Sequence, residues 1–286
     1  METYRSALRI GDLDVRSSSL RELADYHGAS PEECLKRCLH WEDWSVQEWK
    51  SADRSTEEGL QDFYRRVKSW AFDLTWYAYL QESGHVFPAS VAAVRFALQN
   101  TTGRDHLDFG SGTGTTAQLF FRSGFTTTMA DISGTLLDYA TWRLDAHGDQ
   151  ANRIDLTTEN LPSNAYDFIT ALDTLVHVPD FDATARDLHR AIRPGGYMLA
   201  NFDVRERDDH GSLWHLHNDP KLLDHRLRVA GFVRTHTLAD LTCCYLAVDP
   251  TRPTYKLATA VDAAALPLKR AKKRGLDFLH GLRKPE

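Results

Sequence analysis

The sequence has few of the features that mark membrane-spanning, secreted or nucleic-acid-binding chains. Among 286 residues, 34 Lys or Arg stand against 40 Asp or Glu, so the net charge of −6 gives no overall positive field to attract nucleic acid. No apolar run approaches the roughly 20 residues that span a bilayer. The first 14 residues mix charges of both signs and lack the apolar core of a signal peptide. We therefore expect a cytoplasmic protein without a transmembrane segment.

Cysteine is also scarce, with only four in the chain. Cys243 and Cys244 are neighbours in a strand-like run and point to opposite faces, whereas Cys34 and Cys38 share one helix face. A metal site needs two more ligands at suitable spacing, and none is adjacent. We expect buried structural thiols and no metal.

The first 85 residues are predicted to be helical, and they hold five of the seven tryptophans. Ser30 and Pro31 form a strong helix start. A longer helix is expected from about residue 57 to 80, because its apolar residues follow the helical period and no glycine or proline interrupts it after Gly59. Two interpretations stay open for residues 1–85: a helical bundle with an aromatic core, or a lid that closes over a substrate.

Residues 86–250 alternate strands with helices, which predicts an α/β fold with a doubly wound, mostly parallel seven-stranded sheet. Only a few residues separate the last two strands, so that pair is expected to be antiparallel. The expected strands are Asp105–Phe109, Phe125–Ala130, Arg153–Leu156, Tyr166–Leu172, Tyr197–Phe202, Phe232–Thr237 and Cys243–Val248.

The last segment, residues 251–286, is a basic tail with nine Lys or Arg against three acids. Its leucines give it some amphipathic character. We expect a surface helix that docks on the acidic N-terminal zone. The alternative is a weak contact with an anionic membrane or a carrier.

The most informative stretch follows the first expected strand. Asp108 ends an apolar run, and Gly110, Gly112 and Gly114 follow at alternate positions. Glycine is needed where a strand turns sharply into a helix and the backbone approaches a ligand closely. A dinucleotide site would have the spacing G-x-G-x-x-G, but here the third glycine comes one residue early and Thr115 takes its place.

Four later segments extend this pattern in order along the chain. Met129-Ala130-Asp131 closes the second strand with an acid 17 residues after Gly114. Leu161-Pro162 precedes the fourth strand, Leu172 to Asp180 follows it, and Arg193-Pro194-Gly195-Gly196 precedes the fifth. Over residues 86–250, this arrangement resembles the class I S-adenosylmethionine-dependent methyltransferases. The resemblance implies a Rossmann-like fold that binds S-adenosyl-L-methionine.

The resemblance also implies which residues hold that cofactor. Asp131 inherits the role of accepting both ribose hydroxyls, a bidentate use that suits a carboxylate. The adenine contact stays open between Asp155 and Thr157, because the family's usual acid stands two residues early here. The implied cofactor residues are Asp108, Gly110, Ser111, Gly112, Gly114, Asp131, Ile132, Asp155, Leu156 and Asp173.

His177 is the best candidate for a general base, because it follows the fourth strand, where ligands of open α/β sheets collect. The alternative is that it only packs near the cofactor. Tyr77, His215 and His217 are expected to contact the acceptor. The polar segment Asp208 to Asp219 is expected to wall the substrate site, and we do not expect its histidines to bind a metal.

The sequence thus predicts an enzyme that transfers a methyl group to O, N or C of a small molecule, such as a secondary metabolite, by direct displacement. A nucleic-acid acceptor is not expected, because the chain is acidic and no N-P-P-Y segment follows the fourth strand. Two other functions stay open: a non-catalytic subunit that binds the cofactor, and a nicotinamide-dependent oxidoreductase. The sequence does not indicate an oligomeric state.

Overall fold

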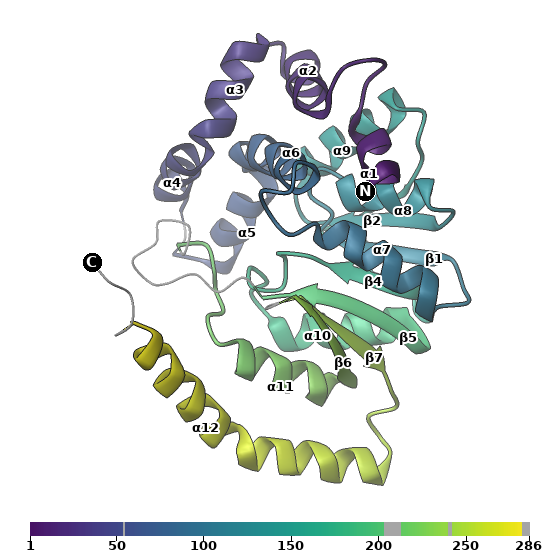
Figure 1. The fold of residues 1–286 in the computed structure, drawn as a ribbon. Helices are drawn as coiled ribbons and strands as arrows, with labels where there is room; N and C mark the ends of the chain where they lie inside the picture. The colour runs from purple at the N-terminus through teal and green to yellow at the C-terminus, as the bar shows by residue number, and fades with distance from the viewer. Residues whose placement is uncertain (54, 203–212, 240–241, 282–286) are drawn as a thin grey trace.

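The computed structural model describes residues 1–53, 55–202, 213–239 and 242–281, without the side chains of residues 57 and 272–281. A seven-stranded sheet in the order β3-β2-β1-β4-β5-β7-β6 forms its centre (Figure 1). The strands are β1 Asp105–Phe109, β2 Thr126–Asp131, β3 Asn152–Asp155, β4 Tyr166–Ala171, β5 Ile192–Asn201, β6 Phe232–Ala239 and β7 Thr242–Ala247.

Strands β1 to β5 are parallel, and β7 runs antiparallel to both β5 and β6. The predicted fold class and the antiparallel last pair are therefore confirmed. The start of β5 differs from the prediction: Ile192 already pairs with Tyr166, five residues before Tyr197. Arg193 to Gly196 lies within β5, at a point where the register shifts, and the preceding helix ends at Ala191.

Helices cover both faces of this sheet, and neighbouring residues of β4 show how. Phe168 packs with Phe120 of α8 (Thr115–Arg122), at 5.6 Å between ring centroids. Its neighbour Ile169 lies in a separate cluster with Leu188 of α10 (Phe181–Ala191) and Leu227 of α11 (Pro220–Ala230). Successive strand side chains point to opposite faces, so apolar residues at adjacent positions give a sheet buried on both sides. Helices α7 (Ala89–Asn100) and α9 (Gly134–Ala146) complete the alternating pattern.

The N-terminal helices form a separate group at the top of Figure 1. They are α1 Glu2–Leu8, α2 Val15–His27, α3 Pro31–Leu39, α4 Trp41–Ser51, α5 Glu57–Arg66 and α6 Ser69–Glu82.

The expected single helix over residues 57–80 is wrong, because it is divided into α5 and α6. Val67 is 2% exposed and leaves the helical conformation, with ψ at 127°. The carboxylate of Glu48, on α4, accepts hydrogen bonds from the backbone N–H groups of Lys68 (3.0 Å) and Ser69 (3.2 Å). Glu48 thereby satisfies donors that the first turn of α6 leaves without helical partners.

The tail also differs from expectation. It forms α12 (Pro253–Gly281), which packs along α11 rather than on the N-terminal zone. His225 Nδ1 lies 2.7 Å from Asp262, and Arg270 donates to Asp219 at 2.6 Å. Within the described residues, no helix has the length and apolar character needed to cross a membrane.

A buried charge cluster joins the N-terminal helices to the sheet layer. Glu22, on α2, accepts from Arg143 Nε at 2.6 Å and lies 2.5 Å from His147 Nε2, both at the end of α9. The three side chains are between 2% and 5% exposed. Because a buried charge without its partner is strongly destabilising, this cluster fixes α2 to α9.

We expect Glu22→Gln to lower the free energy of unfolding by about 3–5 kcal/mol, because Arg143 would stay buried without its counter-charge. Urea unfolding followed by circular dichroism measures the change. Asp25→Asn is the matched control on the same helix: its pair with Arg21 is exposed (61% and 48%), so a change below about 1 kcal/mol is expected. Equal effects of the two substitutions would contradict the inferred role of the cluster.

Candidate functional site

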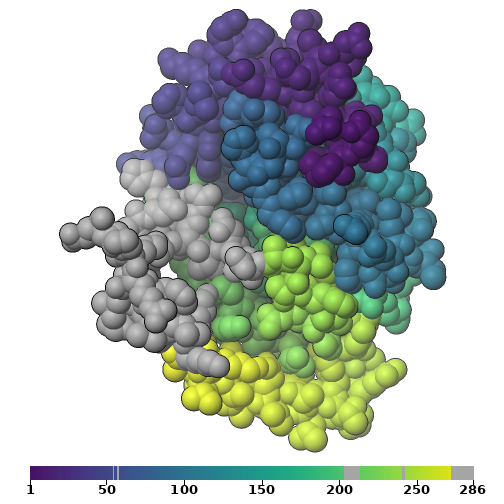
Figure 2. Space-filling view, in the orientation of Figure 1, coloured from purple at the N-terminus to yellow at the C-terminus, as the bar shows by residue number. Residues whose placement is uncertain are grey.

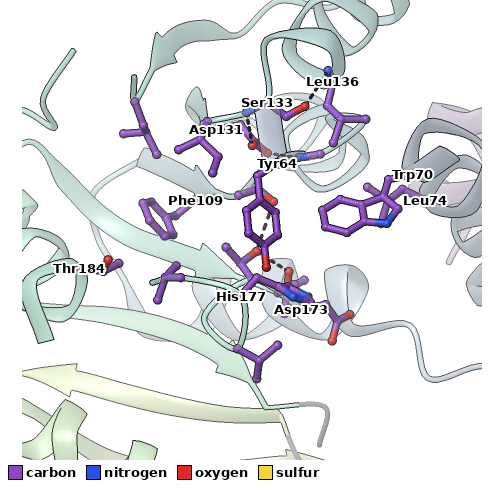
Figure 3. A pocket seen from close by; sticks show the side chains of 18 of the residues that line it. Tyr64, Trp70, Leu74, Phe109, Asp131, Ser133, Leu136, Asp173, His177 and Thr184 are labelled. Carbon is purple, nitrogen blue, oxygen red and sulfur yellow. Dashed lines mark hydrogen bonds between the residues drawn. The ribbon is translucent and has the colours of Figure 1, made fainter. Parts of the chain in front are cut away.

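A cavity of about 420 Å³ lies where the carboxyl ends of β1, β2 and β4 meet the N-terminal helices. In Figure 3, Tyr64 of α5 stands between Asp131 above and His177 below, with Trp70 and Leu74 of α6 to one side. The cavity thus has one wall from the sheet edge and another from N-terminal helices that precede β1 in the chain. Ligands of open α/β sheets collect at this edge.

The glycine loop after β1 forms part of the wall. Gly110 and Gly112 line the cavity with positive φ angles of 69° and 53°. A Cβ on Gly110 would lie 2.2 Å from Thr174, and one on Gly112 would lie 2.6 Å from Leu74. The positive φ angle favours glycine at both positions, and at Gly110 the space beside Thr174 also excludes a side chain.

Gly114 and Ser111 belong to the same loop but do not line the cavity. Gly114 precedes α8 at φ 72°, and a Cβ there would lie 2.9 Å from Met129 Sδ in the core. Gly114 therefore allows α8 to pack closely on the sheet. Ser111 is 8% exposed, and its Oγ has no hydrogen-bond partner within the described residues.

Asp131 holds the loop in place from the end of β2. Its Oδ2 accepts from Gly112 N and its Oδ1 from Ser133 N, each at 2.9 Å. The carboxylate is 8% exposed, and burial raises its pKa. Each oxygen keeps a second lone pair, so Asp131 can bind paired hydroxyl groups while it secures the loop. Ile132, the next residue, also lines the cavity.

Asp108 lies beneath the loop and outside the cavity lining. It accepts from Thr170 Oγ1 at 2.7 Å and from Ala117 N at 3.1 Å, and so connects β1 to β4 and to the first turn of α8. Burial raises the pKa of the Asp108 carboxyl to about 7. His106 Nε2 reaches the same Thr170 hydroxyl at 2.9 Å, and burial holds the pKa of that imidazole well below its ordinary value.

Around β3, Leu156 lines the cavity and Asp155 does not. Asp155 Oδ1 accepts from the hydroxyl of Thr157 at 2.6 Å and from its N–H at 2.9 Å, and these bonds lower the pKa of the Asp155 carboxyl. The two residues between which the adenine contact was left open therefore bind each other.

Asp173 follows β4 and lines the cavity in an uncommon backbone conformation for a residue with a side chain, at φ 51°. Its N–H donates to Asn201 Oδ1 at 2.6 Å, and Asn201 Nδ2 donates back to its carboxylate. This reciprocal pair ties the segment after β4 to the end of β5 and supports the left-handed conformation.

His177 lines the cavity with its ring orientation set by the backbone. Its Nδ1 donates to the carbonyl oxygen of Trp214 at 2.9 Å, and the hydroxyl of Tyr64 donates to the same oxygen at 3.0 Å. Because a carbonyl only accepts, the neutral ring carries its proton on Nδ1 and its basic lone pair on Nε2. The His215 ring, which also lines the cavity, packs edge-on at 4.7 Å.

The remaining predicted acceptor residues lie in different places. Tyr77 of α6 lines the cavity. His217 turns away: its Nε2 donates to Val178 O at 2.8 Å, its ring packs on Phe181, and burial lowers its pKa. Residues 208–212 of the expected substrate wall lie outside the described residues. No group of His, Cys, Asp or Glu suited to a metal occurs in the part of the chain that the structure describes, where all four cysteines are buried.

Sequence reasoning missed the aromatic part of the wall. Trp70 stands 5.8 Å from the His177 ring and 6.3 Å from Trp214, between ring centroids, and Trp41 stands 6.1 Å from Trp214. All three tryptophans and Tyr64 line the cavity. The helical spacing of Trp70 only indicates a buried face, and no local pattern shows that this face meets Trp214.

We expect the stability that Asp108 contributes to fall as the pH rises. In the folded protein the pKa of Asp108 is about 7, whereas in the unfolded chain the carboxyl has the ordinary, lower pKa of an aspartate. At a pH between these two values the native state binds one proton that the unfolded state has lost. The stability difference between wild type and Asp108→Asn should therefore shrink by about 2–3 kcal/mol between pH 5 and 7.5. Urea unfolding at both pH values tests this, with exposed Asp145→Asn as the control for loss of one charge. A difference independent of pH would contradict it.

Comparison with known proteins agrees with this geometry. A family model described as a methyltransferase domain matches residues 83–241. The chain is 27% identical over 178 residues to a ubiquinone biosynthesis O-methyltransferase of Klebsiella pneumoniae, covering 56% of this chain and 72% of that one. It is 30% identical over 141 residues to methyltransferase GfsG of Streptomyces halstedii, covering 45% of this chain and 51% of that one.

Among solved structures, phosphoethanolamine N-methyltransferase 2 of Haemonchus contortus, in complex with S-adenosyl-L-methionine, aligns with a TM-score of 0.49 at 20% identity. That alignment covers 61% of this chain and 44% of the other. The match to the family model spans more than half of the sequence and includes the glycine loop, β2 and His177. The chain therefore belongs to the class I S-adenosylmethionine-dependent methyltransferases.

Proposed function

We propose that this chain transfers a methyl group from S-adenosylmethionine to O, N or C of a small-molecule acceptor. The observation that carries the proposal is one cavity lined by Gly110, Gly112, Asp131 and His177 together with aromatic side chains. In this proposal residues 86–250 hold the cofactor, and residues 1–85 form the acceptor-binding lid. The basic tail has no part in the transfer.

The residues of the sheet edge fit the cofactor. Gly110 and Gly112 have no side chain, so a ligand can approach the backbone of the loop closely. Asp131 lines the same part of the cavity. We assign cofactor contact to Gly110, Gly112, Asp131, Ile132, Leu156 and Asp173. Asp108, Ser111, Gly114 and Asp155 keep a supporting role around this edge, because they lie outside the lining. When bound, S-adenosylmethionine supplies a methyl group activated by a sulfonium.

His177 takes the acceptor's proton at Nε2 in this proposal. The Trp214 carbonyl holds Nδ1, so the ring cannot turn its protonated nitrogen toward the acceptor without losing a hydrogen bond. A positioned base of this kind contributes about 10²–10⁴-fold to a rate when the acceptor group must lose a proton. Alignment of the acceptor supplies the larger part of the rate enhancement in a direct displacement.

The aromatic wall suits an acceptor that contains a ring. Trp41, Tyr64, Trp70 and Trp214 line the cavity, and aromatic side chains of this kind pack favourably against another ring. We assign acceptor contact to these four residues and to Tyr77 and His215, which line the same cavity. His217 lies outside the cavity lining and donates a hydrogen bond to the carbonyl oxygen of Val178, which lines the cavity.

We expect Asp131→Ala to weaken S-adenosylhomocysteine binding by about 1.5–3 kcal/mol, because a charge-assisted hydrogen bond to the sugar is lost. Isothermal titration calorimetry measures the change, and thermal unfolding checks that the variant folds. The control is Asp138→Ala on α9, whose side chain is 60% exposed and pairs with Arg153. Unchanged affinity in Asp131→Ala would remove this residue from the cofactor site.

We expect His177→Gln to lower kcat by about 10²–10⁴-fold without changing the affinity for the cofactor. The assay follows tritium from S-[methyl-³H]adenosylmethionine into a panel of one- and two-ring phenols and anilines.

The control for His177→Gln is His85→Gln, at an exposed histidine outside the cavity lining. A wild-type kcat in His177→Gln would contradict the role of His177 as a base and would mean that the histidine only packs near the cofactor. No methyl transfer by the wild-type protein to this panel or to a metabolite extract, with cofactor binding intact, would favour the non-catalytic partner subunit instead.

A further inference from the structure

The terminal helix α12 has its polar and apolar faces reversed relative to an ordinary surface helix. The face toward α11 carries polar groups: Tyr255 donates to the carbonyl oxygen of Arg228, Asp262 pairs with His225, and Arg270 pairs with Asp219. A surface helix of a globular protein usually buries its apolar stripe and exposes its polar one. Polar contacts therefore attach this helix to the body and leave another face for solvent.

The outward face of α12 is apolar over three turns. Leu257, Val261 and Leu268 are 68%, 62% and 76% exposed. Their spacing of four and seven residues places them along one side of the helix. Between Leu257 and Leu268 every exposed residue is apolar; the others are Ala258, Ala260, Ala263, Ala264 and Pro267. We call the exposed residues from Leu257 to Leu268 the apolar ridge.

The charge of the chain is divided between this tail and the rest. Residues 251–286 hold nine Lys or Arg against three acids, which leaves 25 against 37 in residues 1–250. Lys256 precedes the apolar ridge. Lys269 and Arg270 follow it and pair with Asp262 and Asp219, and the sequence continues with Lys272, Lys273 and Arg274. A negative surface therefore attracts the tail and repels the body, which orients the molecule with α12 toward that surface.

We propose that the apolar ridge of α12 docks on an anionic membrane surface, with the helix lying in the plane of the lipid headgroups. The helix has 29 residues, so it is roughly 44 Å long along its axis, and the part drawn in yellow occupies the lower edge of the molecule in Figure 2. An apolar stripe beside clustered cations is the combination that holds amphipathic helices on such surfaces. It combines two modest contributions, apolar burial and attraction of each cation to the negative surface.

A second copy of the chain fits the ridge less well. Two copies that met through α12 would bring two basic tails together, at a cost in charge repulsion. An anionic lipid surface instead accepts the apolar ridge and is attracted by the net positive charge of residues 251–286. The membrane proposal is independent of the methyl-transfer proposal, because none of the α12 residues whose side chains the structure describes lines the cavity.

Co-sedimentation of the full chain with vesicles tests the proposal. We expect binding to vesicles of 30% phosphatidylglycerol in phosphatidylcholine, and at least tenfold weaker binding to pure phosphatidylcholine or in about 0.5 M NaCl. The triple variant Leu257→Ser, Val261→Ser, Leu268→Ser should weaken binding to the anionic vesicles at least tenfold. Its thermal unfolding and its affinity for S-adenosylhomocysteine should match those of wild type.

The matched control is Leu13→Ser, Leu39→Ser, Leu98→Ser, which replaces three other exposed apolar residues (41%, 60% and 45%) and should bind vesicles as wild type does. Light scattering after gel filtration measures the mass of each protein. No sedimentation of wild type with anionic vesicles would overturn the proposal. A dimer that the α12 triple variant converts to monomer, without vesicle binding, would overturn it in favour of a second copy.

Discussion

The hydrogen bond between Gly112 N and the Asp131 carboxylate is the contact on which the cavity depends. It joins the glycine loop after β1 to the end of β2, and the Asp131 carboxylate also binds Ser133 N at the start of α9. Two segments that are distant in sequence thus share one buried acid. Because both of its oxygens are held by backbone donors, the carboxylate lies at the cavity wall in a defined orientation before any ligand arrives.

A second buried acid plays a complementary part. Asp108 connects the end of β1 to α8 and to Thr170 of β4, directly beneath the loop. The two carboxylates have different roles in the architecture: Asp131 lines the cavity, whereas Asp108 lies outside the lining and links β1 to α8 and β4. The resemblance in sequence implies a cofactor role for both, because a motif records order along the chain and not which side of the loop each side chain occupies.

Local pattern predicted the sheet well, because strands such as β1 and β4 are short runs with buried apolar residues and the strands alternate with helices along the chain. β1 has the expected bounds, and the antiparallel pair follows from the short distance between its strands. Contacts between segments that are distant in sequence could not be predicted from local pattern. Glu48 divides α5 from α6 from twenty residues away, and Trp214 meets Trp70 across 144 positions. The docking of α12 on α11 likewise rests on pairs such as Asp262 with His225, which no periodicity reveals.

The carbonyl oxygen of Trp214 accepts from two groups at once, the His177 ring and the Tyr64 hydroxyl. One group belongs to the sheet edge and the other to a helix of the N-terminal layer. The tyrosine does not bind the imidazole directly; the two are linked only because they share one acceptor. A single backbone carbonyl, in a segment that follows β5, therefore fixes the two layers of the cavity wall relative to each other, and a shift of that segment would displace the imidazole and the phenol together.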